Sequence, residues 1–258
     1  MTNVLLSARE LEVRYGPVLA VRGVSMEVCQ GEIVALIGAN GAGKSSILKA
    51  LIGLHRPSAG TVVFQGQATE SFPVHRKVGS GLALIPEGRR IFVDQTIDDN
   101  LRLGAVTQTH LSKAECAADR DRVYSLFPRL AERAKQMAGS LSGGEQQMLA
   151  IGRGLLCRPK LLMIDELSLG LAPKIVEQLI GVLRTLNQDG LTILLVEQMA
   201  VQALSVAHRA YVLSNGKIVN QGVASELAQD PTIIASFLGK AHTSGHAPAN
   251  VSQGAPHG

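Results

Sequence analysis

The sequence predicts an α/β protein in which a mostly parallel sheet core carries an antiparallel β subdomain and a helical subdomain. Three observations lead to this prediction. Short, continuously apolar segments of strand length alternate with helical patterns along most of the chain. A stretch near the start alternates apolar and polar residues instead. A long segment in the middle has no strand signal at all.

The first third of the chain contains the expected antiparallel strands and the first buried strand. Residues 9–28 alternate apolar and polar side chains around a Gly16-Pro17 turn, which is typical of half-exposed antiparallel strands. The run 33–37 is continuously apolar and β-branched, and a glycine-rich stretch then leads into a helical pattern that ends near Ile52. Further strands are expected at 61–66 and 81–86.

The rest of the chain continues the alternation after the helical subdomain, which is expected at about 88–140. We expect a helix from Ser142 to about Leu156 and another that begins at Pro173 and ends before Gly190. The other elements expected are strands at 161–165, 192–196, 210–214 and 217–222 and a helix near 200–207. Residues 1–239 are therefore predicted to form one domain. Residues 240–258, polar but almost without charge, are predicted to be a disordered tail.

Composition limits the class of protein. The chain has 258 residues, of which 46% are hydrophobic, so it can bury a sizeable core. Its net charge of +4 is too small and too dispersed to indicate a nucleic-acid partner. Three widely spaced cysteines are typical of reduced thiols rather than of a disulfide framework. We expect no signal peptide, because the first residues lack a cationic region followed by a long apolar stretch. We expect no membrane span, because each apolar run is interrupted by Gly or a carboxylate.

A phosphate-binding loop follows the first buried strand. The residues in order are Gly38, Ala39, Asn40, Gly41, Ala42, Gly43, Lys44 and Ser45, which match the P-loop pattern in its required place between a strand and a helix. The glycines let backbone N–H groups converge on phosphate, and the helix adds the positive end of its dipole. We expect Lys44 to reach the β- and γ-phosphates and the Ser45 hydroxyl to bind Mg²⁺. The alternative is a glycine-rich turn that only packs a helix on a sheet.

Two carboxylates close the strand at 161–165. Asp165 lies where a P-loop protein needs a carboxylate to hold the metal. Glu166 follows directly, and a carboxylate beside the metal can deprotonate the attacking water, so Glu166 is the candidate general base. The alternative for Glu166 is that it only caps the helix that begins near Pro173.

A second glycine motif indicates which P-loop family this is. Residues 141–146 read Leu-Ser-Gly-Gly-Glu-Gln, and a helix and the LLMIDE strand follow. The order of P-loop, helical segment, LSGG motif and strand resembles that of ATP-binding cassette (ABC) proteins, and no guanine-reading Asn-Lys-x-Asp sequence occurs. The hydroxyl of Ser142 and the N–H groups of Gly143 and Gly144 can form a second phosphate clamp at a helix N-terminus. Ser142 could equally be an ordinary helix N-cap.

The family resemblance implies an ATP-sandwich dimer and further ATP-binding residues. The LSGG motif, including Glu145, would face the γ-phosphate held by the other subunit. Tyr15 would stack on adenine, with a packing aromatic at a strand end as the alternative. Ser46 would complete the P-loop contacts, and Ser168-Leu169-Gly170-Leu171 would be the D-loop that touches the partner subunit. The cofactors implied are ATP and Mg²⁺.

Two departures from the general pattern narrow the resemblance to the ATPases of branched-chain amino acid importers, of the LivF type. Glu87, in IPEGRRIF, replaces the usual Gln, and Gln198, in LLVEQ, replaces the usual switch His. Glu87 is tolerable only near Mg²⁺ or a cation such as Arg89 or Arg90, so it is expected in the metal site. Gln198 can donate to the γ-phosphate without carrying charge, which leads to the hypothesis of slow intrinsic hydrolysis.

This resemblance also implies the partners. We expect transmembrane permease subunits, docked beside Glu87 and the helical subdomain, and a second ATPase that forms a heterodimer, with a homodimer as the alternative for the isolated chain. A periplasmic or extracellular solute-binding protein would act indirectly. The chain would then lie peripherally on the cytoplasmic face of the cell (inner) membrane. Alternatives are importers of urea, other amides or other amino acids, a soluble ABC ATPase, and a nucleotide-binding regulator that does not hydrolyse ATP.

Overall fold

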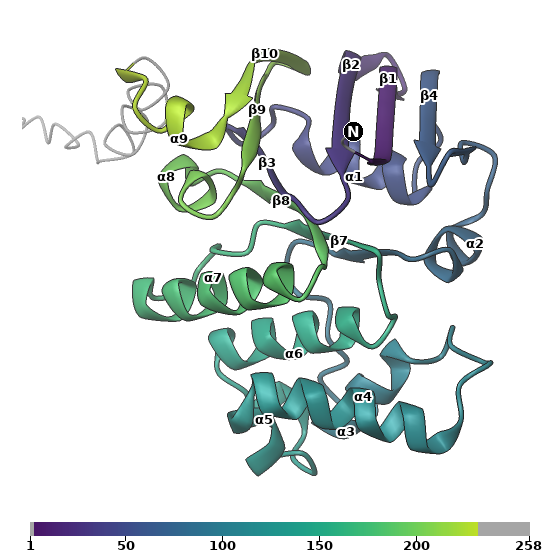
Figure 1. Cartoon of the computed structure of the whole chain (residues 1–258), viewed down its shortest axis with the longest axis vertical. Coiled ribbons are helices and arrows are strands. Elements are labelled where there is room, and N and C mark those ends of the chain that lie inside the picture. Colours follow the sequence, from purple (N-terminus) through teal and green to yellow (C-terminus); the bar gives the residue numbers. More distant parts are fainter. Residues whose placement is uncertain (1–2, 232–258) are drawn as a thin grey trace, which may run out of the picture.

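The computed structural model describes residues 3–231 of the chain and contains two sheets with helices packed around them (Figure 1). The predicted tail at 240–258 lies outside the described residues. The strands are β1 (Val4–Tyr15), β2 (Val18–Cys29), β3 (Ile33–Gly38), β4 (Ala59–Phe64), β5 (Gln67–Ala68), β6 (Leu82–Ile85), β7 (Leu161–Asp165), β8 (Thr192–Glu197), β9 (Arg209–Ser214) and β10 (Lys217–Val223). The helices are α1 (Lys44–Ile52), α2 (Val74–Gly79), α3 (Ile97–Gly104), α4 (Lys113–Leu126), α5 (Pro128–Glu132), the 3₁₀ turn η1 (Ala138–Ser140), α6 (Gly143–Leu155), α7 (Pro173–Gln188), α8 (Ala200–Leu204) and α9 (Ala224–Leu227).

The larger sheet has the strand order β10-β9-β3-β8-β7-β6 and is parallel except for β10 at one edge. The smaller sheet has the order β2-β1-β4-β5 and is antiparallel. The predicted α/β class, with a mostly parallel core and an antiparallel β portion, is therefore confirmed. Three short elements, α2, β5 and α9, were not expected, since two to six residues carry too little periodicity to show in a sequence.

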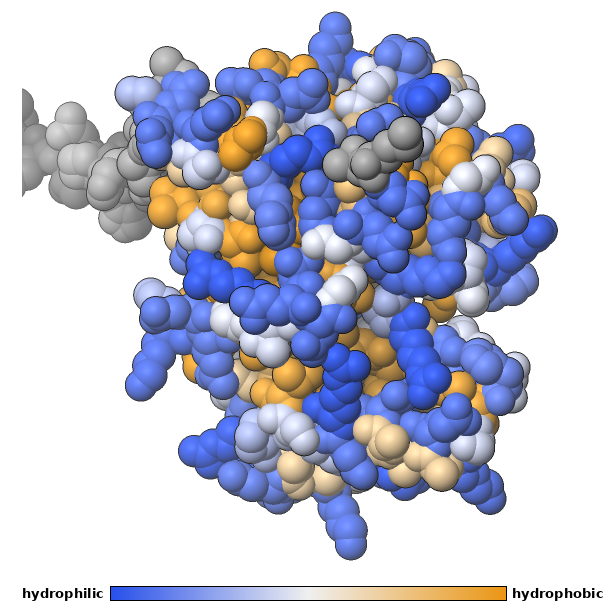
Figure 2. Space-filling model, in the orientation of Figure 1, coloured by the Kyte–Doolittle hydropathy of each residue, from blue (hydrophilic) through white to orange (hydrophobic). Residues whose placement is uncertain are grey.

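The residues of β3 alternate between two apolar cores. Ile33, Ala35 and Ile37 face the core that the sheet shares with α6 and α7. Val34 and Leu36 face a second core, which also contains α1 and the inner face of the antiparallel sheet. Burial on both faces explains why β3 reads as a continuous apolar run rather than an alternating one. In Figure 2, hydrophilic side chains cover most of the visible face and apolar ones lie in separate patches.

The middle of the chain is helical from α3 to α5, and these helices pack on α6. At Gly104 in α3 a Cβ atom would lie 2.2 Å from the carbonyl oxygen of Arg153, so only glycine lets α3 approach α6 this closely. Ile97 and Phe127 belong to the same apolar core as Ile164 of the sheet. The 88–140 boundaries of the helical subdomain remain a prediction.

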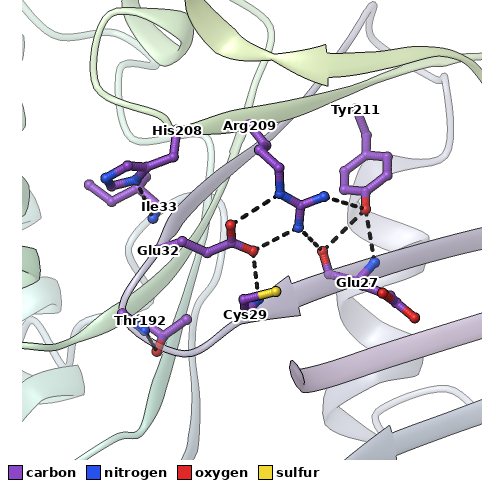
Figure 3. Close-up of polar contacts among 9 residues, drawn as sticks. Glu27, Cys29, Glu32, Ile33, Thr192, His208, Arg209 and Tyr211 are labelled. Carbon is purple, nitrogen blue, oxygen red and sulfur yellow. Dashed lines mark hydrogen bonds and ion pairs between the residues drawn. The ribbon is translucent and has the colours of Figure 1, made fainter. Parts of the chain in front are cut away.

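A polar network pins the antiparallel sheet to the beginning of the parallel sheet (Figure 3). The Arg209 guanidinium donates to both carboxylate oxygens of Glu32, at 3.1 and 2.8 Å, and to the carbonyl oxygen of Glu27 at 2.9 Å. The hydroxyl of Tyr211 accepts from the Glu27 N–H at 3.0 Å. Burial raises the pKa of Glu32, but the hydrogen bonds from Arg209 and from the Cys29 N–H outweigh burial and lower it overall. Glu32 and Arg209 lie at the amino ends of β3 and β9, whereas the P-loop follows the carboxyl end of β3.

A buried lysine supports the helix that follows the P-loop. Lys77 of α2 is fully buried, and its ammonium donates to the carbonyl oxygen of Leu51 at 2.9 Å, in the last turn of α1. A cation at a helix C-terminus interacts favourably with the helix dipole. Burial nevertheless lowers the pKa of Lys77, and the charge of Glu70 offsets only part of that effect.

Candidate active site

The ends of three parallel strands bring the candidate residues together. β8 lies between β3 and β7, and Ile37 pairs with Glu197 while Asp165 pairs with Val196. Because carboxyl ends of parallel strands meet at one edge, the loops after β3, β7 and β8 share one site.

Close backbone contacts hold the P-loop. At Gly43, whose φ is +108°, a Cβ atom would lie 2.7 Å from the carbonyl oxygen of Ala20. At Gly38 it would lie 2.6 Å from the carbonyl oxygen of Leu213. Side chains are therefore excluded at both ends of the loop, which lies against β2 and β9. Between them, Asn40 and Gly41 are exposed, and Ala42 donates its N–H to the Ala39 carbonyl oxygen at 3.1 Å.

Lys44 lies inside this loop. It is only 4% exposed, and its ammonium donates to the carbonyl oxygens of Gly38, at 2.9 Å, and Ala39, at 3.2 Å. The same nitrogen lies 3.4 Å from Oε1 of Glu166, in an ion pair with little exposure. Ser45 and Ser46 follow in the first turn of α1, half-buried.

Glu166 has a strained backbone that places its carboxylate over the P-loop. Its φ is +55°, a left-handed conformation that is uncommon for a non-glycine residue and tends to occur at functional sites. Its N–H donates to the carbonyl oxygen of Val196 at 2.9 Å, which fixes the residue against β8. The idea that Glu166 caps the next helix is wrong, because α7 has Ala172 at its N-cap and no side-chain cap.

Asp165 has the properties of a metal ligand. It is 5% exposed, and its Oδ1 has no hydrogen-bond partner in the structure. Burial raises the pKa of Asp165, as do the charges of Glu166 and Glu87, and the hydrogen bond from Ser45 and the charge of Lys44 lower it only in part. A buried carboxylate oxygen without a donor is costly unless a cation or proton satisfies it. The position therefore fits Mg²⁺.

The rest of the donor set fits Mg²⁺ rather than a metal held by protein alone. Within residues 3–231 no group of three or more His, Cys, Asp or Glu side chains could hold a metal ion. Mg²⁺ does not need such a group, since it typically takes one or two protein oxygens together with substrate phosphates and water. Glu87 is exposed but close enough to raise the Asp165 pKa.

The LSGG motif forms the N-terminus of α6. Ser142 is the N-cap: its hydroxyl accepts from the Glu145 N–H, and the Glu145 carboxylate accepts from the Ser142 N–H at 2.9 Å and from its hydroxyl at 2.8 Å. This capping box agrees with the alternative prediction that Ser142 is an ordinary helix N-cap. The Glu145 carboxylate also forms an ion pair with Arg133 at 3.2 Å. Among the described residues, no hydrogen bond or ion pair joins Ser142, Gly143 or Gly144 to the P-loop.

Two further predicted residues lie at the surface. Tyr15, at the end of β1, is 40% exposed and packs against the ring of His55, with ring centroids 4.4 Å apart and ring planes tilted by 36°. Gln198, directly after β8, is exposed. His55 covers one face of the Tyr15 ring, and the ring is still partly exposed, which suits stacking of a nucleotide base on it.

Sequence reasoning missed Glu197 and the contacts of Arg89. Glu197 is 2% exposed and accepts two hydrogen bonds from Ser168, one from its N–H and one from its hydroxyl, both at 2.9 Å. Arg89 donates to Gln146 of α6 at 3.3 Å and to the Leu169 carbonyl oxygen at 3.5 Å. The signal for Glu197 was present, since a carboxylate that closes an apolar strand is the feature that singled out Asp165.

Comparison with known proteins identifies the family. A family model described as ABC transporter matches residues 21–168, which is more than half of the chain. The chain therefore belongs to the ABC transporter family, and it is an ATPase of that family that binds ATP.

Relatives confirm the narrower resemblance. The chain is 45% identical to the high-affinity branched-chain amino acid transport ATP-binding protein BraG of Pseudomonas aeruginosa, over 91% of this chain and 100% of that protein. It is 34% identical to the probable branched-chain amino acid transport ATP-binding protein LivF of Archaeoglobus fulgidus, over 87% and 94%.

Solved structures confirm the ABC ATPase fold. An ATP-binding subunit of an ABC transporter matches with a TM-score of 0.79 at 28% identity, over 92% of this chain and 98% of that one. The ADP conformation of MJ1267, an ATP-binding cassette of an ABC transporter, matches with a TM-score of 0.82 at 23% identity, over 93% and 100%.

Proposed function

We propose that this chain is the ATP-hydrolysing subunit of an importer that carries branched-chain amino acids across the cytoplasmic membrane. The observation that carries the proposal is the group at the P-loop: Lys44 is buried in the loop beside Glu166, and Asp165 has an oxygen without a donor. The solute is proposed because BraG, at 45% identity over its whole length, is a branched-chain amino acid transport protein.

ATP would bind along the P-loop, at residues 38–46, with Tyr15 against the adenine. Lys44 would move from the carbonyl oxygens of Gly38 and Ala39 to the β- and γ-phosphates. Its ammonium would form stronger, charge-assisted hydrogen bonds with the phosphate oxygens. Ser45 and Asp165 would hold Mg²⁺, with Glu87 at its margin. When bound, Mg²⁺ would neutralise phosphate charge and orient the phosphates.

Hydrolysis would depend on Glu166 and Gln198. Glu166 would accept the proton of the attacking water, since its carboxylate lies beside the P-loop lysine. Gln198 would donate its amide N–H to the γ-phosphate without adding positive charge. A low intrinsic rate that the assembled transporter raises is therefore expected.

A second subunit would complete the site. The N–H groups at the start of α6 and the hydroxyl of Ser142 would contact the γ-phosphate held by the partner. That hydroxyl donates to Glu145 in the single chain, so it would have to rotate when the dimer closes. We infer a heterodimer in the cell, with a homodimer as the alternative for the isolated chain.

The permease would dock near Glu87. Three exposed apolar side chains lie in this region: Phe92 is 52%, Val93 49% and Met137 56% exposed. Backbone contacts hold the two segments together, with Gly139 donating to the Val93 carbonyl oxygen at 3.0 Å and Thr96 bridged to Met137. Apolar side chains gathered at one place are typical of protein docking surfaces.

The proposed location is the cytoplasmic face of the cell (inner) membrane, as a peripheral subunit bound to permease subunits. None of the helices in residues 3–231 is long and apolar enough to cross a membrane. A periplasmic or extracellular solute-binding protein would deliver the solute to the permease and would not touch this chain.

Two measurements test the proposal. Purified chain should hydrolyse ATP, whereas Glu166→Gln should bind ATP, lose turnover and accumulate as an ATP-bound dimer in size-exclusion chromatography. Equal turnover by the two proteins would refute the catalytic assignment.

Uptake of labelled leucine and labelled urea should then be compared in cells that carry the wild type or Glu166→Gln together with the permease subunits. Loss of leucine uptake alone supports a branched-chain amino acid importer. Loss of urea uptake alone supports an amide importer and overturns the proposed solute.

A further inference from the structure

A buried carboxylate joins two loops of the active site. Glu197 is the last residue of β8 and is almost inaccessible to solvent. Its Oε1 accepts the N–H of Ser168 and its Oε2 accepts the Ser168 hydroxyl, each at 2.9 Å. Both oxygens of one carboxylate are therefore bound to one residue of the loop after β7.

The position of this contact matters because reacting groups lie on both sides of it. Gln198 follows Glu197 directly at the end of β8. Glu166 lies two residues before Ser168, and its N–H donates to the carbonyl oxygen of Val196, the residue before Glu197. The ends of β7 and β8 are thus fastened at two adjacent points.

We propose that Glu197 is a positioning residue that fixes the Ser168–Leu171 loop to the end of β8 and so holds Gln198 and Glu166 at a set distance. This inference rests on the proposed roles of those two residues. A two-point contact to a buried carboxylate resists sliding and rotation of the loop. Breaking it leaves a buried acceptor unsatisfied, so the contact persists while other parts of the site move.

The contact also links the site to the partner subunit. If the Ser168–Leu171 loop touches the partner, any shift of Gln198 towards the γ-phosphate is carried to that loop through Glu197. Leu169 in this loop is 50% exposed, so it is free to make such a contact. Glu197 itself touches neither nucleotide nor water in this scheme.

The test is a double-mutant cycle on steady-state ATP hydrolysis by the full-length chain. Ser168→Ala removes the hydroxyl, and Glu197→Gln keeps the side-chain shape but removes the charge. Each single variant should lower kcat about tenfold while the KM for ATP stays within about twofold, because alignment is lost rather than binding. The double variant should lose less than the product of the two single effects, since both substitutions weaken the same two-point contact.

Thr192→Val is the matched control. Thr192 is a buried polar residue at the other end of β8, and its hydroxyl oxygen accepts from the Gly31 N–H at 3.0 Å. This variant should lower the melting temperature but keep kcat. If circular dichroism shows that Glu197→Gln does not fold, the kcat of Ser168→Ala alone tests the role of the contact.

Three results overturn the inference: normal kcat in folded Ser168→Ala, single effects that multiply in the double variant, or an equal loss of kcat in Thr192→Val. A different result addresses the proposed function. If Glu166→Gln hydrolyses ATP normally, the catalytic assignment fails, whereas an inactive Glu166→Gln beside a normal Ser168→Ala overturns only the role of Glu197.

Discussion

The ammonium of Lys44 and the carboxylate of Glu166 form a nearly buried ion pair at 3.4 Å. The two groups, proposed above as the phosphate-binding cation and the general base, thus neutralise each other while both are largely withheld from solvent. Removing one partner of such a pair leaves an uncompensated buried charge. Nucleotide binding would exchange the carboxylate for phosphate oxygens around Lys44 and release Glu166 towards the water.

Lys44→Ala should weaken ATP binding by at least about tenfold, because the charge-assisted contact to the phosphates is lost. Isothermal titration calorimetry measures this effect. Lys49→Ala is the control, since Lys49 is exposed on the same helix. Equal ATP affinities for Lys44→Ala and wild type would contradict the assignment of the loop.

Tyr15→Ala should weaken ATP binding by about 1–3 kcal/mol if the ring stacks on adenine. Tyr15→Phe keeps the ring and should bind as the wild type does. His55→Ala should have a smaller effect, since it removes only the side chain that backs Tyr15. Fluorescent nucleotide titration provides the measurement, and unchanged binding by Tyr15→Ala would make Tyr15 a packing residue.

Gln198→His should raise the intrinsic rate of ATP hydrolysis, because a protonated imidazole adds positive charge beside the γ-phosphate. Steady-state phosphate release with the isolated chain checks this prediction. Gln198→Asn, which keeps an amide on a shorter stem, is the control and should not raise the rate. No change or a lower rate for Gln198→His would show that the amide does not limit turnover.

Arg89→Ala should lower kcat, by about threefold to tenfold, because Arg89 connects the segment after Glu87 to α6 and to the Leu169 carbonyl oxygen. Its own carbonyl oxygen accepts from Arg153 at 3.2 Å. Arg90→Ala is the matched control, since Arg90 is exposed and its side chain has no hydrogen bond or ion pair in the described part of the chain. Equal rates for the two variants would refute the role of Arg89.

Lys77→Met should remove a pH dependence of stability. The pKa of Lys77 is lowered in the folded state by burial, so the unfolded chain binds more protons between that pKa and the ordinary lysine value of about 10.4. The free energy of unfolding of the wild type should therefore rise with pH through this window, relative to Lys77→Met. Urea denaturation at pH 8 and pH 10 tests this, with exposed Lys113→Met as control. Parallel pH curves for wild type and Lys77→Met would contradict it.

Much of the fold was predictable because the elements that build it are long or strongly patterned. β3, β7 and β8 read as buried strands since both of their faces are covered. Pro173 and Gly190 marked the ends of α7 correctly. The predicted helix near 200–207 ends earlier, at Leu204, because short helices depend on packing more than on their own sequence.

In the candidate site, too, residues of local motifs could be predicted from the sequence, whereas contacts between distant segments could not. Residues that belong to local motifs, such as Lys44, Ser45 and Asp165, could be predicted from the sequence because phosphate and metal chemistry requires them at fixed spacing. The structure places these residues close together, and their roles stay predictions. The contact from Glu197 to Ser168 spans 29 residues and depends on the neighbouring positions of β7 and β8. No spacing in the sequence reports such a contact.

The sequence by itself determined the class of this protein and its phosphate-binding chemistry, since a P-loop between strand and helix acts through its own backbone and adjacent side chains. Only the tertiary structure decided which groups face one another: Lys44 beside Glu166, Arg89 beside α6, and Glu197 beneath Ser168. The physical reason is that side-chain pairing follows strand order and register, which arise when the whole sheet assembles.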